Sequence, residues 1–248
     1  RMLETKKIKE AAVYILYGED EYLISKVMRL LRSSIVDADF GDFNYTRLEC
    51  NGSMKAAELV NALRELPMLA DKRLLELHFY QNIAESTVKK IEKTFQETLQ
   101  EGSTVICLVS HNEAKKSKSK LITWSQDFAQ EINCSVSTYN LPRWIELYLK
   151  EKGCKFKDSK TAQELQNRVG TNLLELSSQL DQLVLYVGDK KIIDIEDVRL
   201  VIHQSNEVKV WEYTKALTQK DYKKAMQTCA SLLEDNAQRG SLTLIAFT

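Results

Sequence analysis

The first stretch whose residue types could do chemistry is a turn that carries Gly18, Glu19, Asp20 and Glu21, directly after an apolar run at residues 13–17. A buried strand that ends in glycine and leads into an amphipathic helix is how an α/β nucleotide-binding domain usually begins. The N-terminus of such a helix attracts phosphate, whereas three acidic side chains would repel it. We therefore interpret these acids as charges that complement the helix dipole.

Sequence motifs that bind phosphate are missing. A P-loop needs Gly-x-x-x-x-Gly-Lys-Ser/Thr, and the Rossmann fingerprint needs Gly-x-Gly-x-x-Gly. The eight glycines are too widely spaced for either pattern: Gly18, Gly41, Gly52, Gly102, Gly153, Gly170, Gly188 and Gly240. The strand expected at residues 104–110 is followed by the single acid Glu113, where an ATPase would place its magnesium-binding and catalytic carboxylates. We predict no catalytic residues and no nucleotide cofactor.

Nucleophilic and metal-dependent chemistry lack a sequence signature as well. The chain has no Gly-x-Ser-x-Gly elbow, and no Ser or Cys has a general base nearby in the sequence. The three histidines, His78, His111 and His203, are far apart and show no ligand spacing to cysteines or acids. We predict no metal site.

The cysteines favour a reducing compartment. All five are scattered without a Cys-x-x-Cys pair, and most lie among apolar residues, as reduced, buried thiols do. The N-terminus has no apolar signal segment, and no later segment is long and apolar enough to span a membrane. We expect a cytoplasmic protein without a membrane partner.

An apolar pair, Met68 and Leu69, is the most unusual feature of the sequence. It directly follows a helix, expected at residues 56–66, whose own apolar face is already complete. Two interpretations stay open. The pair either staples the helix end onto the sheet, as most large apolar residues do, or forms an exposed wedge that enters an apolar pocket on a partner.

A short basic run is the second stretch that could bind a partner. Lys115, Lys116, Lys118 and Lys120 place four positive charges at the end of the expected fourth strand. Such a run can track nucleic-acid phosphates, but it is more often a solvated loop. The whole chain has 35 basic and 35 acidic residues and a formal net charge of zero, so its composition does not indicate nucleic-acid binding.

The elements that position these residues alternate between strands and helices through the first 140 residues. We expect strands at residues 13–17, 45–50, 73–80, 104–110 and 135–139. The helices between them are expected at residues 20–36, 56–66, 87–99 and 119–131. This alternation predicts a mostly parallel sheet that is covered by helices on both faces.

Beyond Pro142 the strand signals nearly vanish. Helices are expected at residues 143–151, 160–169, 173–187 and 195–203, which together make a small bundle. Two more are expected at residues 211–217 and 222–233, in a third unit cut short at the end of the chain. The fold class is therefore α/β followed by all-α. The expected domains are residues 1–140, 141–208 and 209–248.

The chain resembles the delta subunit family of the bacterial DNA polymerase III clamp loader. The resemblance covers essentially the whole chain and rests on the order and spacing of four motifs. The first two are Tyr-Gly-Glu-Asp-Glu-Tyr-Leu at residues 17–23 and Leu-Pro-Met-Leu-Ala-Asp-Lys-Arg at residues 66–73. The third is the strand at residues 105–110 with the basic residues that follow it. The fourth is Gly-Thr-Asn-Leu-Leu-Glu-Leu at residues 170–176, followed by Leu180, Leu183, Leu185 and Tyr186.

The resemblance implies an AAA+ protein with a RecA-like domain that lacks a P-loop, a helical lid and the start of a helical collar. Family members hold and open the ring-shaped sliding clamp within a five-subunit loader, while neighbouring subunits use ATP. The family's clamp-binding element falls by position on Met68 and Leu69, flanked by Leu66, Pro67, Ala70 and Asp71. The implied partners are the sliding clamp (beta) and, through the collar, other loader subunits, with primed DNA contacted indirectly or weakly. An incomplete collar would assemble poorly.

Two alternative functions remain open. An atypical NTPase would bind and hydrolyse ATP in a saturable manner, and the missing Gly-Lys-Ser/Thr argues against it. A nucleic-acid-binding regulator that uses residues 115–120 would show a salt-sensitive DNA affinity that does not depend on Met68 and Leu69. The sequence favours a non-catalytic clamp-binding subunit over both.

Overall fold

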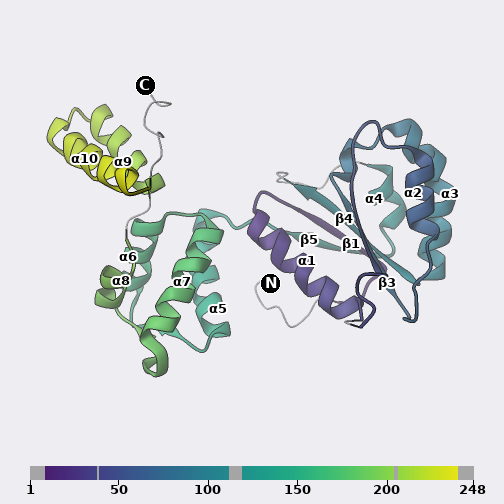
Figure 1. Cartoon of the computed structure of the whole chain (residues 1–248), viewed down its shortest axis with the longest axis horizontal. Helices are drawn as coiled ribbons and strands as arrows, with labels where there is room; N and C mark the ends of the chain where they lie inside the picture. The colour runs from purple at the N-terminus through teal and green to yellow at the C-terminus, as the bar shows by residue number, and fades with distance from the viewer. Residues whose placement is uncertain (1–8, 38, 112–118, 204–205, 240–248) are drawn as a thin grey trace. The chain divides into compact units, whose positions relative to one another are not determined.

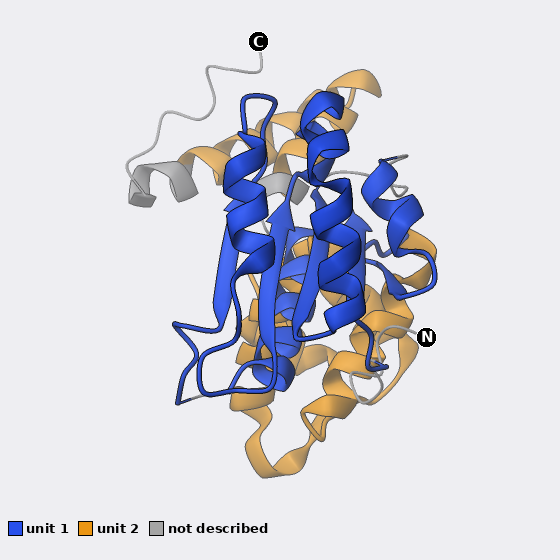
Figure 2. Ribbon diagram, turned by 90° about the vertical axis from the view of Figure 1, so that its right-hand side faces the viewer, with its two compact units in different colours: residues 1–137 blue, residues 138–248 orange. Residues whose placement is uncertain are grey.

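The computed structural model describes residues 9–37, 39–111, 119–203 and 206–239 (Figure 1). The chain divides into two compact units, residues 1–137 and residues 138–248, which are coloured separately in Figure 2. The candidate site residues described below lie in the first unit.

The first unit is built on a five-stranded sheet whose described strand pairs are all parallel. Its strands are β1 (Val13–Gly18), β2 (Tyr45–Glu49), β3 (Arg73–His78), β4 (Thr104–His111) and β5 (Ala129–Asn133). Their order across the sheet is β2-β3-β4-β1-β5, so β2 and β5 are the edge strands. The predicted parallel sheet is confirmed, and so is the α/β class of this half of the chain.

Helices cover both faces of this sheet (Figure 1). One face is covered by α1 (Glu21–Ile35), and the other by α2 (Ala56–Arg64), α3 (Glu85–Glu101) and α4 (Lys120–Ser125). Successive residues of β1 point to opposite faces, because side chains alternate along a strand. Tyr14 and Leu16 pack against α1, whereas Val13 and Ile15 belong to the core under α2, α3 and α4.

The boundaries after α4 differ from the prediction. The expected helix at residues 119–131 ends early, and the expected strand at residues 135–139 lies instead at Ala129–Asn133. Backbone pairing with β1 decides this, because Val13 lies opposite Ala129 and its N–H donates to the carbonyl of Phe128. In β5 only Ile132 is fully buried, so this edge strand has too little apolar pattern to be recognised.

The second unit contains the predicted small bundle, with α5 (Leu141–Glu151), α6 (Ser159–Val169), α7 (Leu173–Val187) and α8 (Ile195–Val201). Side chains cap three of these helices: Asp158 accepts from the Thr161 N–H, Asn172 from the Glu175 N–H, and Asp194 forms a capping box with Asp197. A two-stranded parallel ribbon, β6 (Lys155–Phe156) with β7 (Ile192–Ile193), was not predicted.

Two further helices, α9 (Asn206–Thr218) and α10 (Tyr222–Arg239), pack against each other through small and apolar side chains that include Ala216, Ala225 and Leu232. Single turns of 3-10 helix, η1 (Tyr80–Asn82), η2 (Thr138–Asn140) and η3 (Gly188–Lys190), complete the elements. Among the described residues, no helix is both long enough and apolar enough to cross a membrane.

Candidate functional site

The loop between α2 and β3 exposes large apolar side chains. Leu66 is 69% exposed, Met68 50% and Leu69 72%, while the neighbouring Asp71 is also exposed. Side chains that staple a helix end to a sheet would be buried, so the exposure favours the wedge interpretation of Met68 and Leu69. Large apolar side chains that gather on a surface often mark a site of interaction.

A buried asparagine fixes the backbone of this loop. Asn44 is completely buried immediately before β2, and its amide pairs with both backbone groups of Met68. The Met68 N–H donates to Oδ1 at 2.7 Å, and Nδ2 donates to the Met68 carbonyl at 2.9 Å. Because the two hydrogen bonds leave Met68 little freedom, its side chain is presented to solvent from a fixed backbone.

A buried arginine holds the other side of the loop. The Arg73 guanidinium donates from one nitrogen to the carbonyls of Ala62 and Glu65, at 2.8 and 3.2 Å. Its other terminal nitrogen donates to Thr46 Oγ1 at 2.6 Å and forms an ion pair with the Glu65 carboxylate. Burial lowers the pKa of Arg73, and the Glu65 carboxylate opposes that shift. Arg73 therefore ties the end of α2 to the strands on which the loop stands.

Leu69 adopts a conformation that L-residues rarely use. Its φ angle is 52°, in the left-handed region that costs a residue with a Cβ about 1 kcal/mol or more. Such conformations persist where the surrounding structure imposes them, and they cluster at functional sites. Leu69 directly follows Met68, whose backbone is held by Asn44, and Arg73 begins β3 four residues later.

Backbone donors of the turn that opens the α/β unit are hydrogen-bonded within the chain. The Asp20 side chain caps α1 by accepting from the Leu23 N–H at 3.1 Å, while the N–H groups of Asp20 and Glu19 donate to the Cys134 carbonyl and Ser135 Oγ. Burial raises the pKa of Asp20, although its backbone hydrogen bonds oppose this. The donors that would cradle a phosphate are thus taken by the chain itself.

A chain of four titratable side chains lies at the carboxyl ends of β3 and β4, the edge at which open α/β sheets bind ligands. Buried Glu76 meets His78 at 2.9 Å, His78 meets His111 at 2.8 Å, and His111 meets Glu21 at 2.6 Å. The ring of Phe79 stacks on His111. The sequence alone does not reveal this arrangement, because the two histidines are 33 positions apart and the pairing of β3 with β4 brings them together.

The described residues contain no group of three or more His, Cys, Asp or Glu side chains arranged to hold a metal ion. In the chain of contacts from Glu76 to Glu21, each group meets its neighbours in succession, with no common centre. Its geometry is that of a hydrogen-bonded relay between strand ends. It secures the start of α1 against the sheet.

Three of the four lysines of the basic run, Lys115, Lys116 and Lys118, lie outside the described residues. Lys120 begins α4 and is exposed. A nucleic-acid contact at this run stays a prediction.

Comparison with known proteins agrees with this architecture. Residues 14–136 match the family described as DNA polymerase III, delta subunit. DNA polymerase III subunit delta of Bacillus subtilis (strain 168) is 22% identical over 244 residues, which cover 94% of this chain and 69% of that protein. The probable DNA polymerase III subunit delta of Aquifex aeolicus (strain VF5) is 27% identical over 239 residues, 92% of this chain and 65% of that protein.

The chain belongs to the DNA polymerase III delta subunit family. The solved structure of the Bacillus subtilis DNA clamp loader delta protein (YqeN) matches with a TM-score of 0.73 at 19% identity, covering 94% of this chain and 70% of that one. The chain therefore has the fold of that delta protein. The family member described here spans about two thirds of the length of these relatives.

Proposed function

We propose that this delta family chain is a clamp-loader subunit that binds a ring-shaped sliding clamp through Met68 and Leu69. The observation that carries the proposal is the exposure of these two side chains on a loop whose backbone is fixed by Asn44 and Arg73. A rigid loop loses little conformational entropy when it binds, so its apolar contacts translate into affinity. The family membership of the chain supports the choice of partner.

In this proposal, Met68 and Leu69 enter an apolar pocket on the clamp, and Leu66, Pro67, Ala70 and Asp71 border the contact. Binding opens the clamp only if the subunit has a higher affinity for the open ring, because a ligand shifts an equilibrium by its differential affinity alone. Clamp opening requires no catalysed reaction in this chain, because the free energy of the contact itself shifts the equilibrium towards the open ring.

We also propose that this subunit does not hydrolyse ATP and holds no cofactor. The support is the turn at Gly18, where the backbone donors next to α1 are already bound to Cys134 and Ser135. Calorimetric titration of the purified chain with ATP and Mg²⁺ should give no saturable heat. Stoichiometric binding would contradict the proposal and favour the atypical NTPase.

Assembly with other loader subunits is assigned to the collar helices of residues 209–248, and the bundle of residues 141–208 is proposed as the lid. Contact with primed DNA is expected to be indirect or weak. These assignments follow from the family and from the order of the helical elements along the chain.

The test is clamp binding by a Met68→Ser/Leu69→Ser variant, measured by surface plasmon resonance. Truncating interface anchors costs about 2 kcal/mol or more, so we expect the affinity to fall by at least roughly 30-fold. The matched control is Leu174→Ser/Leu185→Ser, which removes two side chains of α7 that are 64% and 82% exposed. Circular dichroism checks that both variants fold. A folded wedge variant with the wild-type affinity would refute the proposal.

A further inference from the structure

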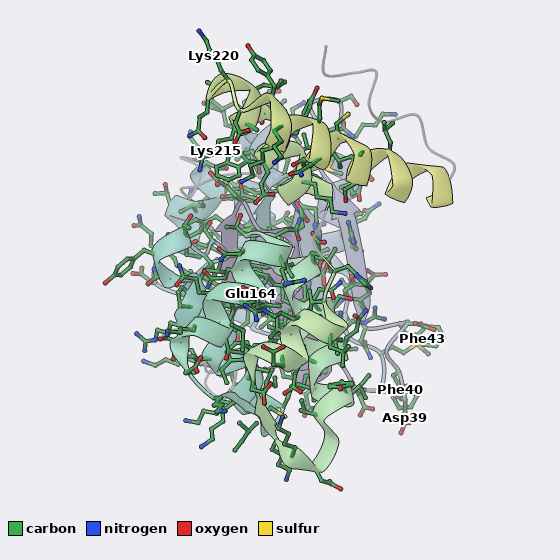
Figure 3. All side chains as sticks on the ribbon, turned by 90° about the vertical axis from the view of Figure 1, so that its left-hand side faces the viewer. Asp39, Phe40, Phe43, Glu164, Lys215 and Lys220 are labelled. Atoms are coloured by element: carbon green, nitrogen blue, oxygen red, sulfur yellow. The ribbon has the colours of Figure 1, made fainter. Side chains whose placement is uncertain are left out.

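We propose that Phe43 is a third apolar contact for the partner of Met68 and Leu69. The inference rests on the proposed function and extends its binding surface to a second turn of the chain. Phe43 is 62% exposed, although its sequence context does not distinguish it from a core residue. Figure 3 shows it on the turn that precedes β2, together with Phe40 and Asp39.

The sheet places this turn beside the wedge loop. Strands β2 and β3 pair in parallel with Tyr45 opposite Leu74. The segments that precede the two strands therefore lie at the same end of the sheet, where both strands begin. The Leu74 N–H donates to the Asn44 carbonyl at 2.9 Å, while the Asn44 side chain holds both backbone groups of Met68. Phe43 is the residue directly before Asn44, so its backbone is one residue away from the side chain that binds Met68.

The turn that carries Phe43 is as firmly held as the wedge loop. The carbonyl of Phe40 accepts from the N–H groups of Phe43 and Asn44, at 3.1 and 3.2 Å, and from Asn44 Nδ2 at 3.3 Å. The guanidinium of Arg32 lies 4.0 Å over the ring of Tyr45, just beyond the turn. An aromatic side chain exposed on a fixed backbone is the kind of residue that dominates protein interfaces.

Charge around the apolar side chains defines the chemistry of the partner surface. The exposed residues Asp39 and Asp42 precede Phe43 in the same turn, and the exposed Asp71 follows Leu69 by two residues. Arg32 approaches Asp42 at 3.9 Å but leaves that carboxylate 98% exposed. The partner surface complementary to these residues is an apolar depression with a positively charged rim. The depression accommodates the Phe43 ring beside the Met68–Leu69 pair. We assign this depression to the sliding clamp, where it would be continuous with the proposed pocket for Met68 and Leu69.

The experiment compares clamp binding by Phe43→Ala with that by Phe128→Ala, using the full chain and the purified clamp. Phe128 is a matched control because it is 41% exposed and precedes β5, at the opposite edge of the sheet. We expect Phe43→Ala to weaken binding about 10-fold or more and Phe128→Ala to leave it unchanged. The affinity of the wild type for the clamp should also fall as salt is added, because salt screens the attraction between the carboxylates of Asp39, Asp42 and Asp71 and the positively charged rim.

Three outcomes decide between the proposals. If both the wedge variant and Phe43→Ala bind weakly, the third contact is supported. If the wedge variant binds weakly and Phe43→Ala binds like the wild type, the inference is wrong while the proposed function stands. If neither loses affinity, the proposed function fails and the inference fails with it.

A second measurement avoids substitution altogether. Hydrogen–deuterium exchange of the peptide that covers residues 40–44 should slow when the clamp is added, together with that of residues 65–72. Protection of residues 65–72 alone would overturn the inference.

Discussion

Loss of the Arg73 side chain should destabilise the first unit more than any surface substitution on it. The guanidinium is completely buried and makes hydrogen bonds to two backbone carbonyls and one hydroxyl, besides its ion pair with Glu65. We consider Arg73→Met, which keeps the apolar stem and removes every donor. The carbonyls of Ala62 and Glu65, at the end of α2, then lose their partner.

The magnitude follows from these contacts. A hydrogen bond from a charged group contributes about 1.5–3 kcal/mol, so the two carbonyl bonds together contribute about 3 kcal/mol at the low end. The Glu65 side chain is 55% exposed and regains water when Arg73 is lost, so the broken ion pair adds little. About 3 kcal/mol corresponds to a decrease of roughly 10 °C in the melting temperature of a unit of this size.

The assay is native-state hydrogen exchange of amides in β1, β3 and β4, which reports the opening of the first unit within the full chain. Arg64→Met is the matched control, because Arg64 is an exposed arginine at the last position of α2. Arg73→Lys should recover only part of the loss, since a lysine cannot reach both carbonyls and Thr46 at once. Equal exchange protection in Arg73→Met and Arg64→Met would refute this reasoning.

Three further predictions concern the interior of the first unit. Gly18→Ala should lower the free energy of unfolding by more than about 1 kcal/mol, because its Cβ would lie 2.2 Å from the Cys134 carbonyl oxygen; a urea midpoint equal to that of the wild type would count against this. Burial raises the pKa of Cys50 and of Cys134 to about 12, so above about pH 8.5 the unfolded chain releases these protons first. The free energy of unfolding should therefore fall between about pH 8.5 and 12, by up to about 1.4 kcal/mol per pH unit for each thiol, and denaturation curves of a Cys50→Val/Cys134→Val variant should show a shallower fall. His78→Leu should destabilise by about 3 kcal/mol because it leaves the buried Glu76 carboxylate without this partner, and Glu76→Leu/His78→Leu should be less destabilising than His78→Leu in the same denaturation assay.

Sequence patterns predict helices and strands well where one face of the element is buried and capping residues mark its ends. The helix expected at residues 173–187 matches α7, because Asn172 caps its start and Gly188 follows its end. The pattern fails at β5, whose backbone pairing with β1 leaves little trace in its side chains. The pattern also does not reveal the short ribbon of β6 and β7, because strands of two residues are too short to show a hydrophobic period.

The candidate site was found only in part from the sequence. Met68 and Leu69 stood out because they follow a helix whose apolar face is already complete, but their exposure needed the structure. Nothing in the sequence marks Asn44 as the partner of Met68, because the contact joins residues 24 positions apart through the pairing of β2 with β3. Arg73 carries a weak signal, as a charged residue directly before Leu74 and Leu75 in a strand that also contains Glu76 and His78.

The hydrogen bonds of Asn44 also limit how the wedge could be copied. A synthetic peptide of residues 65–72 would contain Met68 and Leu69 but neither Asn44 nor Arg73, so nothing would hold its backbone or keep Leu69 at a positive φ. Such a peptide would have to order itself on binding, at about 1–2 kcal/mol for each residue. An inhibitor directed at the proposed clamp contact should therefore be a cyclised or scaffolded mimic that reproduces both turns, with the ring of Phe43 included.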